Sequence, residues 1–213
     1  MIKVSLGKLK RAIKPAKSAK DKAFVALYSI KFKEGDIAID CGANVGNVST
    51  YLCKSGATVY AFEPNPHAFA VLEKRLSKYS NSHCYRKAVL DRNTTTKLYF
   101  HTNSDSDELL WSTGSSLLQD KANVRKDKYI EVETINLTEF IRNLQGNIKL
   151  LKLDVEGVEH SILTKLINNG LHKRIEHIFV ETHEKQAHHL QSATKQLKDL
   201  IRSKNITNTN LDW

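Results

Sequence analysis

The sequence predicts an α/β protein with a doubly wound, mostly parallel sheet. Short apolar runs alternate along the chain with helical patterns, as in proteins built from β-α-β units. The apolar run 37–39 leads into a glycine-containing stretch, 40–47, and a second apolar run, 58–62, ends at an acid, Glu63. The order strand, glycine loop, helix, strand, acid is how such a sheet holds an adenosine-containing ligand at the carboxyl ends of its first two strands.

Each predicted element of the first half has its own local signal. The helices carry apolar residues three and four positions apart, and the strands are short apolar runs bounded by turn residues. Asn65 and Pro66 add a helix cap and a proline at the first helical position. The expected elements are a helix over 19–31, a strand over 36–40, a helix over 44–55, a strand over 58–63, a helix from 66, a third strand over 83–90 and an additional strand over 95–101.

The second half begins with a polar stretch, residues 102–128, which is expected to be a loop near the mouth of a site, because long loops in compact domains are usually functional or disordered. Only residues 205–213 follow the last helix, so the C-terminal edge of the sheet should be abbreviated to one short strand. The expected elements are an extra strand over 129–135, a helix over 137–144, a strand over 148–154, a helix over 159–168, a strand over 177–181 and a helix over 184–203.

Composition indicates a single globular body with an unusual start. The 213 residues carry a net charge of +10, and residues 1–33 hold ten Lys or Arg against one acid, so this arm accounts for nine of the ten charges. Such an arm suits an anionic surface, nucleic acid or another polyanion, although a solubilising flank without a partner explains it equally well. The sequence gives no indication of oligomeric state.

Several protein classes are disfavoured. No apolar run approaches the length of a transmembrane segment, and no apolar stretch of a secretion signal follows the basic N-terminus. The three cysteines fit neither a disulfide framework nor a zinc site, which indicates a reducing compartment. We therefore expect a cytoplasmic protein.

The glycine loop distinguishes between adenosine-containing ligands. It reads Gly42-Ala-Asn-Val-Gly46, without the third glycine of a dinucleotide site, and Asp40 precedes it. An acid is a poor neighbour for a pyrophosphate and a good one for the ammonium and sulfonium of S-adenosylmethionine. Glu63 follows Gly42 at the distance that suits a carboxylate binding a ribose diol. The alternative is a glycine turn that binds no cofactor.

A second group of polar residues follows two later strands. Asp154 and Glu156 end the strand at 148–154, and Glu181 and His183 end the strand at 177–181. Both strand ends face the ligand crevice of an open α/β sheet, beside the glycine loop. These side chains should therefore meet the reactive end of the cofactor.

Together these motifs resemble the FkbM-type family of S-adenosylmethionine-dependent methyltransferases. The matching elements are Asp-Cys-Gly-Ala-Asn-Val-Gly, Ala-Phe-Glu-Pro-Asn-Pro, Lys-Leu-Asp-Val-Glu-Gly-Val-Glu and Glu-Thr-His, and the resemblance covers about residues 36–185. It implies a Rossmann-like methyltransferase fold, and the lysine-rich N-terminus and the short C-terminus lie outside the match. We expect residues 1–33 to form a basic arm and helix and residues 34–213 to form the methyltransferase domain. The implied reaction is O-methylation of a hydroxyl on a sugar, glycan or other small metabolite.

The residues expected to act fall into two groups. For catalysis we expect Asp154 or His183 as the base that takes the hydroxyl proton, with Glu156 orienting the acceptor. Asp154 could instead contact only the cofactor, and His183 could only support its neighbours. The residues expected to bind S-adenosylmethionine are Asp40, Gly42, Asn44, Gly46, Asn47, Glu63, Pro64, Asn65, Ala88 and Asp154.

Two alternatives and a metal question stay open. Asp154, Glu156 and Glu181 could supply oxygen ligands to Mg²⁺ or Ca²⁺, but three acids near one cleft are not specific, so no metal site is predicted. An RNA ribose 2'-O-methyltransferase is favoured by the basic arm and disfavoured by its lack of interleaved aromatic residues. A non-catalytic S-adenosylmethionine-binding module would keep the fold without turnover.

Overall fold

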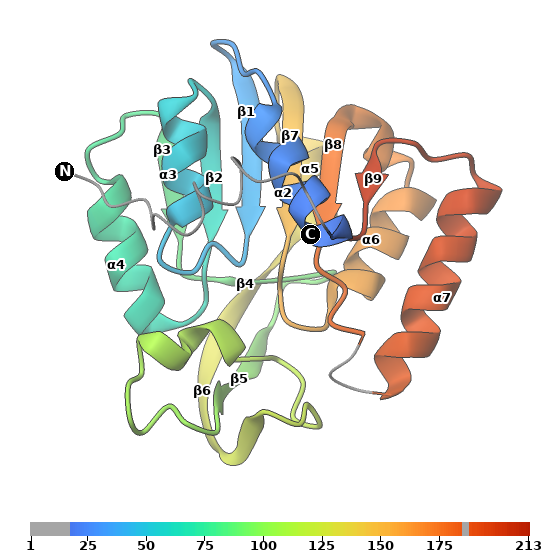
Figure 1. Cartoon of the computed structure of the whole chain (residues 1–213). Helices are drawn as coiled ribbons and strands as arrows, with labels where there is room; N and C mark the ends of the chain where they lie inside the picture. Colours follow the sequence, from blue (N-terminus) through green and yellow to red (C-terminus); the bar gives the residue numbers. More distant parts are fainter. Residues whose placement is uncertain (1–17, 185–187) are drawn as a thin grey trace.

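The computed structural model describes residues 18–184 and 188–213, and its centre is a six-stranded sheet in the order β3-β2-β1-β7-β8-β9. All five neighbouring pairs are parallel, which confirms the predicted fold class. The carboxyl ends of the central strands share the lower edge of the sheet in Figure 1. The strands are β1 (Asp36–Cys41), β2 (Thr58–Phe62), β3 (Ser82–Tyr85), β7 (Asn147–Leu153), β8 (Ile175–Val180) and β9 (Thr209–Asn210).

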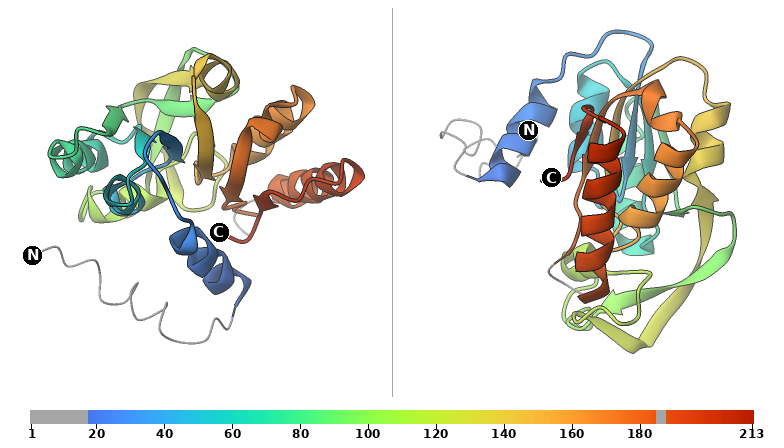
Figure 2. Two further views of the ribbon diagram at one scale, coloured as in Figure 1. Left: turned by 90° about the horizontal axis from the view of Figure 1, so that it is seen from above. Right: turned by 90° about the vertical axis from the view of Figure 1, so that its right-hand side faces the viewer.

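Helices cover both faces of this sheet, as Figure 2 shows. Successive residues of β1 point to opposite faces, so Ala38 packs in one core and Ile37 and Ile39 pack in the other. The face with Ala38 is covered by α2 (Ala19–Ser29), α3 (Asn47–Lys54) and α4 (Pro66–Leu76). The opposite face is covered by α5 (Leu137–Asn143), α6 (Glu159–Asn168) and α7 (His188–Ser203).

A smaller sheet lies below the carboxyl ends of the central strands in Figure 1. Its order is β4-β6-β5, with β4 (Ala88–Leu90) parallel and β5 (Thr95–His101) antiparallel to β6 (Val124–Asn136). The prediction of one strand over 83–90 was wrong in this respect. β2 ends at Phe62, whose partner Tyr85 is the last residue of β3, and Ala88 pairs instead with Thr134 of β6.

The polar stretch 102–128 is more ordered than predicted. It contains a short 3-10 helix, η1 (Leu110–Gly114), and β6 already begins at Val124. The charged residues 125–128 obscure this part of β6 in the sequence, because the strand is half exposed beside β5.

The C-terminal edge is abbreviated as predicted. β9 has two residues, and Trp213 then packs its ring against Phe179 and Phe24, with centroid distances of 6.1 Å to each. The last helix begins at His188 rather than at 184, and residues 185–187 lie outside the described part. Residues 1–17 of the basic arm also lie outside it. Among the described residues, no helix combines the length and apolar content that a membrane crossing requires.

Candidate active site

The glycine loop between β1 and α3 fits only because residue 42 has no side chain. Gly42 has a φ of +76°, and a Cβ on it would lie 1.8 Å from the carbonyl oxygen of Asp154. The backbone N–H groups of Gly42 and Ala43 donate to the carbonyl oxygen of Phe62, at 3.0 and 2.9 Å. The loop is therefore clamped between the ends of β2 and β7. Gly46, at a φ of +78°, begins α3 against Leu72.

Glu63 is a buried carboxylate at the end of β2. Its Oε2 accepts from the N–H of Asn44 and its Oε1 from the N–H of Asn65, both at 2.8 Å. Burial raises the pKa of this carboxyl to about 7, against the lowering effect of the two N–H groups. Each oxygen keeps a further lone pair, so the carboxylate can accept from the two hydroxyls of a diol.

Glu63 opens onto a cavity of about 620 Å³ between the glycine loop and the smaller sheet. Asn44 and Asn65 tie the loop side to the segment around η1, donating through Nδ2 to the hydroxyls of Ser112 (2.9 Å) and Ser115 (3.2 Å). The apolar part of the lining consists of Phe62, Pro64, Ala88, Val89, Leu98, Leu117 and Val155.

These features fit the adenosine part of S-adenosylmethionine. The apolar lining can hold a flat base, and the Glu63 carboxylate can hold a ribose diol. The cradle at Gly42, which a Cβ would fill, allows a ligand to approach the backbone closely. Of the residues expected to bind the cofactor, Gly42, Asn44, Glu63, Pro64, Ala88 and Asp154 line this cavity.

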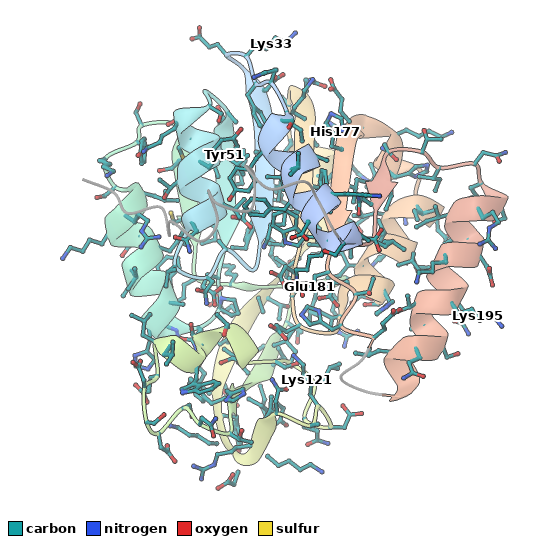
Figure 3. The ribbon with its side chains drawn as sticks, in the orientation of Figure 1. Lys33, Tyr51, Lys121, His177, Glu181 and Lys195 are labelled. Atoms are coloured by element: carbon teal, nitrogen blue, oxygen red, sulfur yellow. The ribbon has the colours of Figure 1, made fainter. Side chains whose placement is uncertain are left out.

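A second cavity adjoins the first through Gly42, Asn44 and Asp154, which line both. Its far wall comes from α2 and the C-terminal segment, and Asn47 lines it as expected for a cofactor-binding residue. Glu181, labelled in Figure 3, also faces this cavity, and its carboxylate pairs with Lys20 at 2.6 Å. The other residues of this wall are Phe24 and Trp213.

Asp40 lies beneath the glycine loop and lines neither cavity. Its Oδ2 accepts from the Ser49 hydroxyl at 2.6 Å, and its Oδ1 lies 3.2 Å from the ammonium of Lys152. Lys152 also donates to the carbonyl oxygen of Gly42 at 3.1 Å and lies 3.4 Å from Oδ2 of Asp154. Burial alone would lower the pKa of Lys152, but the two carboxylates outweigh it and raise this pKa. The buried pair thus supports the loop from below.

His183 brings the ends of β7 and β8 together. Its Nε2 lies 3.6 Å from Oδ1 of Asp154 and 3.4 Å from Oε2 of Glu156, and its Nδ1 lies 2.9 Å from Oε1 of Glu159. The three residues expected to act in catalysis therefore meet at one place. Burial lowers the pKa of His183, but the surrounding glutamates outweigh burial and raise it to about 10.

Glu156 is held from the side of the smaller sheet. It has a φ of +62°, an uncommon backbone conformation for a residue with a side chain. Its carbonyl oxygen accepts from the Ser116 hydroxyl at 2.7 Å, and its carboxylate pairs with the buried ammonium of Lys121. Figure 3 shows Lys121 below the strand ends, on the side of the smaller sheet.

The acids considered as metal ligands do not form a cation site. The carboxylate of Glu181 pairs with Lys20 instead of joining Asp154 and Glu156. A different group, Asp154, Glu159 and His183, has its ligand atoms within 4.8 Å of one another. Asp154 of this group already pairs with Lys152, and Glu159 accepts from two backbone N–H groups. A metal ion at this group would have to displace contacts that these residues already make.

Sequence reasoning missed two charged residues of this site. Glu159 reads in the sequence as an ordinary acid in the first turn of α6, and only its place in the Asp-Val-Glu-Gly-Val-Glu element could have drawn attention to it. Lys121 lies in the weakly patterned stretch before β6 and carries no signal of its own.

Comparisons with known proteins find one family and two methyltransferases. The family described as methyltransferase FkbM domain matches residues 40–205. The 2-O-methyltransferase NoeI of Sinorhizobium fredii is 27% identical over 147 residues, which cover 64% of this chain and 60% of NoeI. The hexuronic acid methyltransferase AglP of Haloferax volcanii is 28% identical over 183 residues, 84% of this chain and 69% of AglP. The match thus spans about three fifths of the length of NoeI.

Proposed function

Because the chain belongs to the FkbM methyltransferase family, we propose that it uses S-adenosylmethionine to methylate a hydroxyl oxygen of a sugar or glycan. The observation that carries this proposal is the position of Asp154, a carboxylate at the junction between the Glu63 cavity and the second cavity. The printed names of NoeI and AglP, a 2-O-methyltransferase and a hexuronic acid methyltransferase, support a sugar as the acceptor class.

The residues around the first cavity would hold the cofactor. Glu63 would accept hydrogen bonds from the ribose hydroxyls, and Pro64 and Ala88 would contact the adenine base. Gly42 and Asn44 would lie beside the part of the cofactor that extends from the ribose toward the second cavity. When bound, S-adenosylmethionine supplies an electrophilic methyl group. Asp40 would act through the loop that it supports rather than through direct contact, and Lys152, which supports the same loop, also lines the second cavity.

Asp154 is the base in this proposal. Its side chain is 25% exposed, and a hydroxyl in the second cavity could come within hydrogen-bond reach of it. Lys152 and His183 lie on either side of its carboxylate and hold it in place at the junction. Asp154 would accept the proton that the hydroxyl loses, while Glu156 would orient the acceptor.

Asp154→Asn is expected to lower the rate of methyl transfer by at least about 100-fold, because Asn cannot accept the hydroxyl proton. The affinity for S-adenosylhomocysteine should stay within a few-fold of wild type. The measurement is transfer of labelled methyl groups to a panel of uronic acids, deoxyhexoses, amino-sugar oligosaccharides and RNA. Glu176→Gln, in the exposed pair with Lys149 on β7 and β8, is the control that should leave transfer unchanged.

Three outcomes of this panel separate the readings. Transfer to a saccharide that is lost in Asp154→Asn supports the proposal. Transfer to RNA and to no saccharide would show that the acceptor is a ribose 2'-hydroxyl of RNA rather than a free sugar or glycan. Saturable binding of S-adenosylhomocysteine without transfer to any member of the panel would favour a non-catalytic binding module.

The affinity for S-adenosylhomocysteine is expected to fall as the pH drops below about 7. The pKa of Glu63 is raised to about 7, so the carboxylate is ionised above this pH and loses its charge below it. The ribose hydroxyls bind the ionised form better, so binding should weaken by up to about tenfold per pH unit in the acid range. Calorimetric titration from about pH 5.5 to about pH 8.5, a range that brackets this pKa, measures the effect.

Glu63→Gln is the matched variant for the pH experiment. It should bind S-adenosylhomocysteine more weakly than wild type at about pH 8, where the wild-type carboxylate is ionised, and lose most of the pH dependence, since it cannot ionise. Equal wild-type affinity on both sides of the Glu63 pKa would contradict a ribose contact by an ionised Glu63.

A further inference from the structure

The ring of His183 is surrounded by hydrogen-bond acceptors. Nδ1 lies 2.9 Å from Oε1 of Glu159 and 3.0 Å from the carbonyl oxygen of Glu181. Nε2 faces the carboxylates of Asp154 and Glu156. A carboxylate and a carbonyl can only accept, so a proton is favoured on each ring nitrogen.

Glu159 is the most firmly held of these acceptors. Its carboxylate is fully buried, and it accepts from the N–H of Val155 through Oε1 and from the N–H of Gly157 through Oε2, both at 2.9 Å. It also stands in the first turn of α6, where the helix dipole favours a negative charge. The two N–H bonds fix the carboxylate in place, with Oε1 against Nδ1 of His183.

The remaining charged neighbours do not reverse this balance. Lys152 pairs with Oδ2 of Asp154, away from the oxygen that faces His183, whereas Lys121 pairs with Oε2 of Glu156, the oxygen that also faces Nε2 of His183. The nearest and most firmly held carboxylate, Glu159, pairs with neither lysine. The His160 ring is buried with a lowered pKa and is not expected to compete for the carboxylates as a cation. The titratable and charged groups near His183 in the described part of the chain are Asp154, Glu156, Glu159, Glu181, Glu184, His160, Lys121 and Lys152.

We propose that Glu159 is a positioning residue that holds His183 as an imidazolium, and that this fixed cation orients the carboxylates of Asp154 and Glu156. The part played by the two carboxylates rests on the proposed function, whereas the charge of the ring does not. It follows that His183 is not the base, because both of its nitrogens already carry protons. The pKa of about 10 for His183 agrees with this assignment.

The charge of His183 can be measured without any acceptor. Protein labelled with ¹⁵N at histidine is followed by NMR from about pH 6 to about pH 8.5, a range that brackets the ordinary histidine pKa. His183→Gln identifies the signals of this ring by their loss. We expect both ring nitrogens of wild-type His183 to stay protonated across the range. A midpoint near the ordinary value, or one unprotonated nitrogen at neutral pH, would overturn the proposal.

Glu159→Gln tests the part that Glu159 plays. Its neutral amide keeps nearly the same shape. For this comparison the titration is extended to about pH 11, above the wild-type pKa of about 10, and the midpoint of His183 should fall by at least about one pH unit. Glu181→Gln is the matched control, since its carboxylate pairs with Lys20 and only its backbone contacts the ring, so it should leave the midpoint in place. Equal midpoints in wild type and Glu159→Gln would remove Glu159 from this role.

Glu159→Asp serves if the glutamine variant does not fold. The shorter side chain keeps the negative charge but places it farther from Nδ1 of His183. It should therefore lower the midpoint of the His183 titration by less than Glu159→Gln would. The wild-type titration stands alone as a test of the imidazolium. Because these readouts need neither cofactor nor acceptor, their failure is distinct from a failure of the methyl-transfer assay.

Discussion

Gly42→Ala is expected to weaken binding of S-adenosylhomocysteine by at least about 100-fold, a loss of about 2.7 kcal/mol. An alanine Cβ at this position would lie 1.8 Å from the carbonyl oxygen of Asp154, which belongs to the backbone at the end of β7. Neither Gly42 nor Asp154 can shift alone, because each is held by a backbone hydrogen bond. The N–H of Gly42 donates to the carbonyl oxygen of Phe62, and the N–H of Asp154 donates to the carbonyl oxygen of Cys41 at 3.1 Å. The loop must therefore leave its place between β2 and β7.

Gly35→Ala is the control for this variant. Gly35 has a similar backbone conformation, with a φ of +87°, but a Cβ there would meet nothing within 4 Å. Both substitutions carry the strain of a left-handed residue, about 1–2 kcal/mol, and only Gly42→Ala adds the collision. Calorimetric titration of both variants, with circular dichroism to confirm folding, separates the two costs. Equal affinities in Gly35→Ala and a folded Gly42→Ala would show that the loop does not depend on the close approach.

The central sheet could be predicted because its signals are local. β1 and β2 are short apolar runs, and the glycine loop after β1 places the ligand site at the carboxyl ends. The division of 83–90 into β3 and β4 could not be predicted, since it depends on tertiary pairing: β3 pairs with β2, and β4 pairs with β6. The early start of β6 was hidden by its charged residues, which are typical of a half-exposed strand.

The candidate site was predictable where strand ends supply its residues. Asp154 and His183 end neighbouring strands, so parallel topology brings them together. Lys121 could not be found this way, because it does not lie at a strand end. It reaches Glu156, 35 residues later in the chain, only through the tertiary folding of the stretch before β6. The charge on His183 was equally hidden, since it depends on a glutamate in another element. The sequence therefore left the base undecided between Asp154 and His183. In the structure the Asp154 side chain is partly exposed, whereas the His183 side chain is buried among carboxylates.

Lys152→Met is expected to lower the free energy of unfolding by about 3–5 kcal/mol, because it leaves the carboxylate of Asp40 buried without its cation. Asp40 is fully buried, and apart from Lys152 its Oδ1 has no partner among the described residues. The effect is measured by urea unfolding of wild type and variant at neutral pH. Lys149→Met is the control on the same strand. Its partner, Glu176, is exposed, so this loss should stay below about 1 kcal/mol.

The double variant Asp40→Asn/Lys152→Met tests whether the pair, rather than the lysine alone, is responsible. The asparagine side chain at position 40 would carry no charge and could still accept from Ser49, so most of the stability lost in Lys152→Met should return. A double variant that loses the sum of the two single effects would contradict this. The recovered protein should still bind S-adenosylhomocysteine more weakly than wild type, because methionine cannot donate to the carbonyl oxygen of Gly42 as Lys152 does. The double variant would then recover stability without recovering cofactor affinity. This result is expected if Lys152 both neutralises the Asp40 carboxylate and supports the glycine loop.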